Sequence, residues 1–367
     1  VSELPKTNSR RYIVYDRISK SMIIGKNEDI KSAMASTTKI MTTIVILEKA
    51  DLNETVTVSA KAGGTGGSRL GLKRGDKASV RDLLYGLMLR SGNDAAVALA
   101  EHVGGSVKEF AELMNEKAIE LGLTNTHFVT PHGLDDANHY TTALELAKLT
   151  DYAMDNETFA KIVGTKSTTI YINNQSRQIN NTNELLGVLN GVVGVKTGFT
   201  NNAGRCLVTE TKRNNMDIIT IVLGADTKKD RTKDSVNLIE YTFSKYKMYN
   251  LEEQIIEEFN KWKNINAIFK ENDVPIMPRN VKMVLYYCYV ACKYMVRDTP
   301  ETKLAPLDFA VAQKILPTIN GSGENLEKLI EDLDKEFDNG MPICAKIIRR
   351  MKEKARDNMG YYQFFAI

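Results

Sequence analysis

Residues 35–48 read ASTTKIMTTIVILE, and the rest of the chain is organised around this stretch. It places Ser36 and Lys39 three residues apart at the start of an apolar run. On a helix, positions i and i+3 share one face about 5–6 Å apart at Cβ, so the lysine amine can reach the serine hydroxyl. A serine at a helix N-terminus also meets free N–H groups and a dipole that favour developing negative charge. The stretch therefore predicts a helix that carries an activated serine nucleophile.

The S-x-x-K spacing is not specific by itself. A second copy, Ser244-Lys245-Tyr246-Lys247, lies late in a helical, basic and polar stretch, where a solvated face explains it. The functional interpretation of Ser36 therefore depends on other motifs in the chain.

The composition excludes several function classes. The chain has 367 residues, 43% of them hydrophobic and 26% charged, which is ordinary for a globular protein of two or three domains. A formal net charge of +3 is too small to imply nucleic acid as a partner. The four cysteines and four histidines lack metal-ligand spacing, so we expect no metal and no cofactor. Because the sequence begins at Val1 without a signal-type apolar segment, either the protein is cytoplasmic or a targeting segment was removed.

Strand-type segments lie at both ends of the first 250 residues. We expect a hairpin at 11–16 and 21–24, and paired central strands at 205–209 and 218–223. Between them, apolar residues at helical spacing predict a helical block from 80 to about 123 and a further helix at 142–154. A long helix from about Thr232 to Tyr246 would close the unit. This order predicts an α/β sheet into which an all-helical subdomain is inserted.

Three polar groupings lie at the edges of these predicted elements. The first is the Ser36 stretch itself. The second is Ser91-Gly92-Asn93, between two predicted helices, and the third is Lys196-Thr197-Gly198, at the end of a strand. Each has a plain structural interpretation, since Ser91 could cap the helix starting near Asp94 and the last triplet could be a strand exit. Their joint occurrence, in this order and in these contexts, is poorly explained by chance.

Together the groupings resemble the serine penicillin-recognising enzymes, whose S-x-x-K, S-x-N and K-T-G motifs carry acyl transfer. The flanking residues at 35–42, 91–96, 131–134 (PHGL) and 194–200 (GVKTGFT) are similar to the low-molecular-mass penicillin-binding proteins. These are serine-type D-alanyl-D-alanine carboxypeptidases that trim peptidoglycan stem peptides. The resemblance covers roughly residues 10–250 and implies an antiparallel sheet flanked by helices, with the inserted helical subdomain.

The resemblance implies catalytic roles for five residues. Ser36 would attack the carbonyl between the two D-alanines, and Lys39, kept neutral by burial and a neighbouring cation, would be the general base. Ser91 would relay a proton to the leaving amine, while Asn93 would hold the substrate amide and the Lys39 side chain. Lys196 would supply a positive field.

Five further residues are implied in substrate binding. Thr197 and Arg231 would bind the terminal carboxylate of the substrate, with Gly198 in the same strand. The backbone N–H groups of the nucleophile and of Phe199 would form the oxyanion hole. His132, in the PHGL segment, would help to position the deacylating water.

Two alternative functions stay open. A class A β-lactamase shares the three motifs but deacylates with a glutamate in a loop after the helical block. The candidates there are Glu145, inside a predicted helix, and Glu157, and neither has the expected flanking pattern. A catalytically silent penicillin-binding sensor is the other alternative. The expected partners are a peptidoglycan stem peptide and β-lactams, in an extracytoplasmic location with the targeting segment absent from this sequence.

The resemblance ends after about residue 260. We expect a catalytic domain at 1–262 and an appended helical bundle at 263–367, which would serve for interaction or spacing with an unknown partner. Residues 315–323 weakly resemble the helical lid of McrB-like AAA ATPases, but the chain has no G-x-x-x-x-G-K-[ST] loop for nucleotide hydrolysis. The basic helix at 343–351 has two interpretations, a solvated face or a membrane-surface segment.

Overall fold

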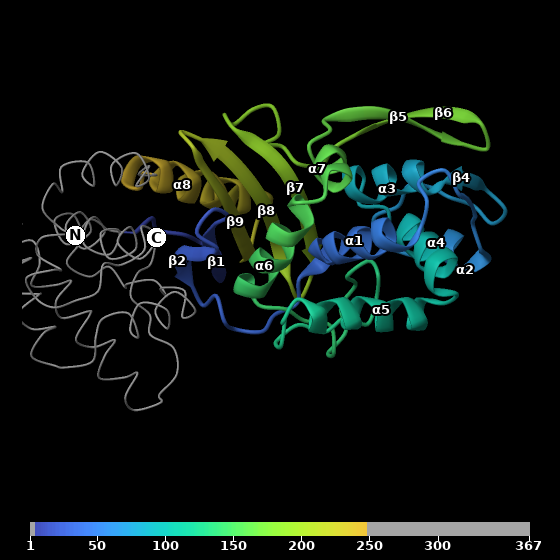
Figure 1. Ribbon diagram of the computed structural model, residues 1–367, viewed down its shortest axis with the longest axis horizontal. Helices are drawn as coiled ribbons and strands as arrows, with labels where there is room; N and C mark the ends of the chain where they lie inside the picture. The colour runs from blue at the N-terminus through green and yellow to red at the C-terminus, as the bar shows by residue number, and fades with distance from the viewer. Residues whose placement is uncertain (1–3, 248–367) are drawn as a thin grey trace, which may run out of the picture. The chain divides into compact units, whose positions relative to one another are not determined.

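A five-stranded antiparallel sheet forms the centre of the computed structural model, which describes residues 4–247 (Figure 1). Its strand order is β2-β1-β9-β8-β7, so the N-terminal hairpin pairs with the last strand of the unit through β1 and β9. The strands are β1 (Arg11–Asp16), β2 (Ser21–Lys26), β7 (Val192–Thr200), β8 (Gly204–Arg213) and β9 (Met216–Ala225). The expected hairpin and paired central strands are confirmed.

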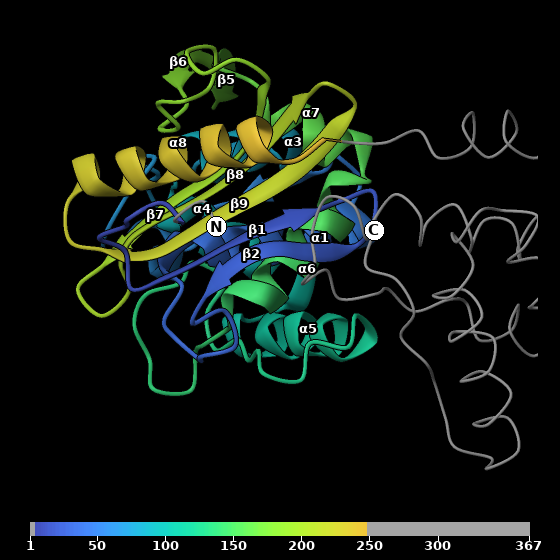
Figure 2. The same cartoon turned by 90° about the vertical axis from the view of Figure 1, so that its left-hand side faces the viewer.

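Helices cover both faces of the sheet (Figure 2). Alternate strand residues point to opposite faces. Val14 and Val222 pack with Leu238 of α8 (Lys228–Lys245), whereas Ile13 and Ile221 belong to the larger core on the other face. That core contains η1 (Ala35–Thr38), α1 (Lys39–Lys49) and α6 (Ala143–Met154). The central strand β9 is nearly continuous in apolar residues because both of its faces are covered.

The segment between β2 and β7 is mainly helical, as predicted. Its main helices are α3 (Val80–Leu89), α4 (Asn93–Gly104) and α5 (Val107–Glu120), and its shorter ones are α2 (Ala60–Gly63) and α7 (Glu157–Val163). Two small two-stranded antiparallel sheets accompany them. One pairs β3 (Thr55–Thr57) with β4 (Lys77–Ser79), and the other pairs β5 (Ser167–Ile172) with β6 (Gln175–Asn180). The first eight residues of α4 are buried, so this helix is the centre of the block.

The structure corrects three details of the sequence interpretation. The Lys196 triplet is not at a strand end, because β7 stays paired with β8 as far as Thr200. The closing helix begins at Lys228 rather than near 232, because the Thr227 side chain accepts the Asp230 N–H and caps it. Ser91 does not cap α4, whose N-cap is Gly92.

Several expectations concern residues outside those described. They are the boundary at 262/263, the appended helical bundle, the lid-like segment at 315–323 and the basic helix at 343–351. Within residues 4–247, no helix combines the length and hydropathy that crossing a membrane requires.

The turn at 131–134 packs closely on the segment that carries Ser36. Gly133 has φ +90°, and a Cβ there would lie 1.9 Å from the Ala35 carbonyl oxygen. Only glycine fits this position, since both the backbone conformation and the available space exclude a side chain. The contact fixes the distance between the turn and η1.

We therefore expect Gly133→Ala to lower the free energy of unfolding by more than about 2 kcal/mol. The matched control is Gly122→Ala, because Gly122 also has a positive φ of +71° but no atom within 4 Å of a Cβ. That change should cost only about 1 kcal/mol, the conformational part alone. Urea denaturation followed by near-UV circular dichroism measures both, and equal losses would contradict the close contact.

Candidate active site

Ser36 and Lys39 lie at the junction of η1 and α1, with the serine on the short helix and the lysine at the first position of α1. The Lys39 Nζ lies 2.8 Å from the Ser36 Oγ. Lys39 is fully buried, whereas Ser36 is partly exposed and lines a cleft. The predicted pair is therefore brought together, with the amine sealed from solvent and the hydroxyl open to it.

The other partners of Lys39 are compatible with a neutral amine. Its Nζ donates to Asn93 Oδ1 at 2.7 Å and to the His132 carbonyl at 3.0 Å, both of which only accept. A neutral amine has two N–H donors and one lone pair. Because the two carbonyls use the donors, the lone pair points to the Ser36 hydroxyl, which is the arrangement a general base needs.

Burial favours this neutral form. It lowers the pKa of Lys39 well below the ordinary lysine value, and the positive charge of Lys196 lowers it further against the opposing effect of Asp94. Lys196 is itself buried, and burial together with the Arg231 charge lowers the pKa of Lys196 to about 7. The Lys196 Nζ donates to the Thr197 carbonyl at 2.8 Å. The expected neighbouring cation of Lys39 is thus Lys196.

The start of α4 holds the glycine-rich loop of residues 63–68 and the segment after it. Asn93 Nδ2 donates to the Gly66 carbonyl at 2.9 Å. The buried Asp94 carboxylate accepts the N–H groups of residues 70, 71 and 72 at 2.8–2.9 Å. Asp94 is a positioning residue that the sequence interpretation missed, and a buried acid directly after the S-x-N motif was the available signal.

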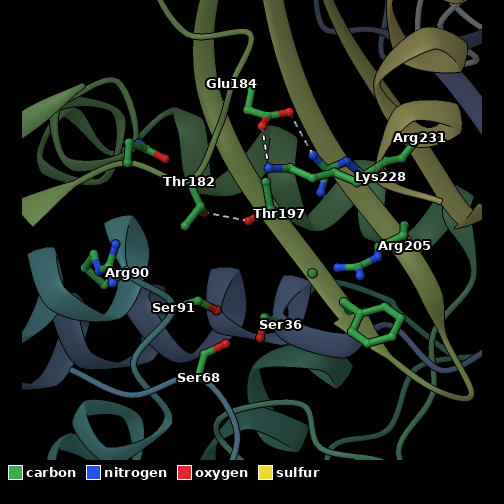
Figure 3. A pocket seen from close by; sticks show the side chains of 13 residues that line it. Ser36, Ser68, Arg90, Ser91, Thr182, Glu184, Thr197, Arg205, Lys228 and Arg231 are labelled. Atoms are coloured by element: carbon green, nitrogen blue, oxygen red, sulfur yellow. Dashed lines mark hydrogen bonds and ion pairs between the residues drawn. The ribbon is translucent and has the colours of Figure 1, made fainter. Parts of the chain in front are cut away.

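Ser91 occupies the sharp turn between α3 and α4. Its φ is +58°, a left-handed conformation that is uncommon for a residue with a side chain. The side chain is nearly buried and lines the same cleft as Ser36 (Figure 3). The strained turn thus holds the Ser91 hydroxyl in the same cleft as Ser36.

The cleft has a volume of about 470 Å³ and runs along β7. Gly198 allows η1 to approach this strand, since a Cβ there would lie 3.0 Å from the Ser36 backbone N. Thr197 Oγ1 lies 2.7 Å from Thr182 Oγ1. The residues that line the cleft are Ser36, Ser68, Arg90, Ser91, Asn181, Thr182, Glu184, Thr197, Gly198, Phe199, Arg205, Lys228 and Arg231.

Positive charge exceeds negative charge in this lining. Arg231, in the first turn of α8, is buried and lies 3.7 Å from Glu184, which also pairs with Lys228. Glu184 is the one acid among the lining residues, against four cations. Such a cleft favours an anionic ligand beside the serine.

The chain matches the family model described as D-alanyl-D-alanine carboxypeptidase over residues 1–227. It belongs to the D-alanyl-D-alanine carboxypeptidase family. DacF of Bacillus subtilis (strain 168) is 37% identical over 245 residues, which are 65% of this chain and 63% of DacF. DacC of Escherichia coli (strain K12) is 39% identical over 265 residues, which are 66% of this chain and 62% of DacC. The chain thus spans less than two-thirds of the length of these curated relatives.

Solved structures agree with the family assignment. The Streptomyces K15 DD-transpeptidase superposes with a TM-score of 0.63 at 34% identity, covering 66% of this chain and 99% of that chain. The D-alanyl-D-alanine carboxypeptidase DacD of Francisella tularensis gives a TM-score of 0.62 at 30% identity, covering 67% and 73%. The expected antiparallel sheet with flanking helices is confirmed. A second family model, a domain of unknown function (DUF8727), matches residues 232–361, and the lid resemblance stays a prediction.

His132 lies next to the Ser36–Lys39 pair, and its backbone carbonyl accepts a hydrogen bond from the Lys39 amine. Burial and the nearby Lys39 lower the pKa of His132 to about 3, so its ring is neutral near pH 7. The ring Nδ1 accepts the Leu134 N–H at 3.1 Å, which leaves Nε2 to carry the proton. The role of the ring in positioning water stays a prediction.

Neither candidate β-lactamase glutamate is among the residues that line the cleft. Glu145 lies in α6, where its carboxylate accepts the Asn125 N–H and the Thr126 hydroxyl. Glu157 is exposed at the start of α7. In the described part of the chain, no group of His, Cys, Asp and Glu residues is arranged to bind a metal.

A first test concerns the neutral amine. Lys39→Arg should lower the rate of Ser36 acylation by a fluorescent penicillin at least about a hundredfold, because a guanidinium cannot act as a base. Raising the pH to 10 should not restore the acylation rate of this variant. A rate close to that of wild type in Lys39→Arg would show that the residue acts only through its positive charge.

A second test concerns the charge that tunes this amine. Acylation should fall at low pH as Lys39 is protonated. Because the charge of Lys196 lowers the pKa of Lys39, Lys196→Gln should move the midpoint of this loss to higher pH. Lys49→Gln, an exposed change on the same helix, is the control and should leave the midpoint unchanged. An unchanged midpoint in Lys196→Gln would contradict the coupling.

Proposed function

We propose that this protein hydrolyses the terminal D-Ala–D-Ala bond of peptidoglycan stem peptides through an acyl-enzyme on Ser36. β-Lactams would acylate the same serine. The observation that carries the proposal is the buried Lys39 amine, which lies 2.8 Å from the Ser36 hydroxyl and donates to two carbonyl oxygens, those of Asn93 and His132. Family membership supplies the substrate class.

The first half of the reaction transfers the acyl group to the enzyme. Ser36 Oγ forms a bond to the carbonyl carbon as its proton passes to Lys39 Nζ. The N–H groups of Ser36 and Phe199 stabilise the oxyanion. The C–N bond then breaks, and the amine of the departing D-alanine takes a proton that Lys39 passes on through Ser91.

The second half releases the shortened peptide. A water molecule attacks the ester carbon of the acyl-enzyme, gives its proton to Lys39, and the proton returns to Ser36 Oγ as the ester bond breaks. In this proposal His132 helps to position that water. No glutamate of the cleft is placed to activate it as in a class A β-lactamase, since Glu184 is the lining acid and it pairs with cations.

The substrate's terminal carboxylate explains the charge of the cleft. We assign it to Thr197 and Arg231, because both line the cleft next to the nucleophile and Arg231 is buried. The buried Arg231 guanidinium shares the Glu184 carboxylate with Lys228, so it can still donate hydrogen bonds to a second carboxylate. This favours a substrate with a free C-terminus.

The location and the C-terminal region remain part of the proposal. Peptidoglycan is an extracytoplasmic substrate, so we place the catalytic domain on that side of the membrane. The appended region at 263–367 would serve for interaction or spacing, with membrane-surface association through 343–351 as one possibility. A catalytically silent sensor is less favoured, because the base, the nucleophile and the cation are all in position.

The decisive experiment compares wild type with Ser36→Ala. Wild type should be labelled by fluorescent penicillin and should release D-alanine from diacetyl-Lys-D-Ala-D-Ala, and Ser36→Ala should lose both at least about a thousandfold. Ser244→Ala is the matched control, because Ser244 belongs to the exposed second S-x-x-K. It should behave as wild type.

Three results would overturn parts of the proposal. Activity that survives Ser36→Ala would remove the nucleophile. Labelling without D-alanine release would favour the silent sensor. Rapid turnover of benzylpenicillin, instead of a long-lived acyl-enzyme, would favour the β-lactamase.

A further inference from the structure

Phe199 and Arg205 form an exposed pair at one end of the cleft. They are partners across β7 and β8, and the Arg205 guanidinium carbon lies 3.8 Å from the centroid of the Phe199 ring. The Phe199 ring is 47% exposed, which is unusual for a large apolar side chain in a strand that is otherwise nearly buried. Both residues line the cleft, and Figure 3 shows Arg205 on the side of Ser36 opposite to Arg90.

The charge of Arg205 is not neutralised within the protein. In residues 4–247, no carboxylate lies within ion-pair distance of its guanidinium. Lys228 and Arg231, by contrast, share Glu184. Stacking on an aromatic ring holds a guanidinium in one orientation and leaves its N–H donors free for a planar anion.

The direction of the bound peptide places its acyl-donor part at this pair. β7 is an edge strand that pairs only with β8 in the sheet, and η1 lies against its face at Gly198, so a peptide can lie along the free edge of β7. Residues 197 and 199 are two apart and present their backbone N–H groups to the same edge. With the terminal carboxylate at Thr197 and the scissile carbonyl at the Phe199 N–H, the donor residues continue past Phe199, antiparallel to β7.

We propose that the Phe199–Arg205 pair binds the acyl-donor residue that precedes D-Ala-D-Ala and selects a side chain that ends in a carboxylate. The apolar stem of that side chain lies on the Phe199 ring, and its carboxylate accepts hydrogen bonds from Arg205. The preferred substrates are thus stem peptides with an acidic third residue rather than a lysine. This inference rests on the proposed function, because the peptide direction is taken from it.

The test uses two peptides that differ only in charge, N-acetyl-L-Glu-D-Ala-D-Ala and N-acetyl-L-Gln-D-Ala-D-Ala. Wild type should hydrolyse the Glu peptide with a kcat/KM about three- to tenfold higher than that of the Gln peptide, as a half-exposed charge-assisted pair provides. In Arg205→Gln the ratio should fall to about one. Arg205→Lys keeps the charge without the planar fork and should retain an intermediate ratio.

Arg90→Gln is the matched control, since Arg90 is also a cation of the cleft without an ion pair among the described residues but lies beyond Ser91. Its ratio should equal that of wild type. Fluorescent penicillin labelling of each variant verifies that the site is folded. The ratio, and not the absolute rate, is the quantity that decides.

Three outcomes would overturn the inference. A wild-type ratio of one, with D-alanine released from both peptides, removes the donor subsite and leaves the proposed function intact. An equal loss on both peptides in Arg205→Gln, with the ratio kept, places Arg205 at the terminal carboxylate instead. Absence of D-alanine release from both peptides in wild type overturns the proposed function and this inference with it.

Discussion

The buried amine of Lys39 is the constraint on which the active site depends. It joins three segments distant in sequence, because its partners are Ser36 in η1, Asn93 in α4 and the His132 carbonyl. Burial disfavours a charged ammonium at this place and lowers the pKa of Lys39, so the enclosure favours a neutral amine whose two N–H donors are both satisfied. The same requirement that stabilises the fold at this point also produces the base. Structure and reactivity are therefore set by one group.

The segments around the amine are held by contacts that do not touch the substrate. Asp94 accepts three consecutive backbone N–H groups and so fixes the loop that borders the cleft. Gly133 lets the turn that carries the His132 carbonyl lie directly on the Ala35 carbonyl. Gly198 lets β7 approach Ser36 in the same way. The two glycines and the buried carboxylate of Asp94 thus help to define the spacing between the segments around Lys39.

The sequence predicted that Ser36 and Lys39 lie together, and it predicted the sheet with its helical insertion, because these depend on local spacing and on long periodic segments. It could not predict that the partner of Lys39 at His132 is a backbone carbonyl, since every residue carries one. It placed the Lys196 triplet at the end of a strand, whereas β7 continues through it and the close approach of η1 requires glycine at 198. It also started α8 too late, because the Thr227 cap adds a turn that contains Arg231 although the apolar periodicity begins only after it.

Three basic groups, those of Arg231, Lys196 and Lys39, form a series in which the charge of each lowers the pKa of the next. An anion bound beside Arg231 reverses the first step, because opposite charge favours the protonated form of Lys196. A more fully protonated Lys196 repels a proton on Lys39 more strongly, so this coupling favours the neutral base and opposes the direct attraction of the bound carboxylate for a proton on Lys39. Binding of a free C-terminus would then both position the scissile bond and prepare the base. This coupling gives a physical reason for the preference of such a cleft for a terminal carboxylate, beyond the binding energy that the carboxylate itself supplies.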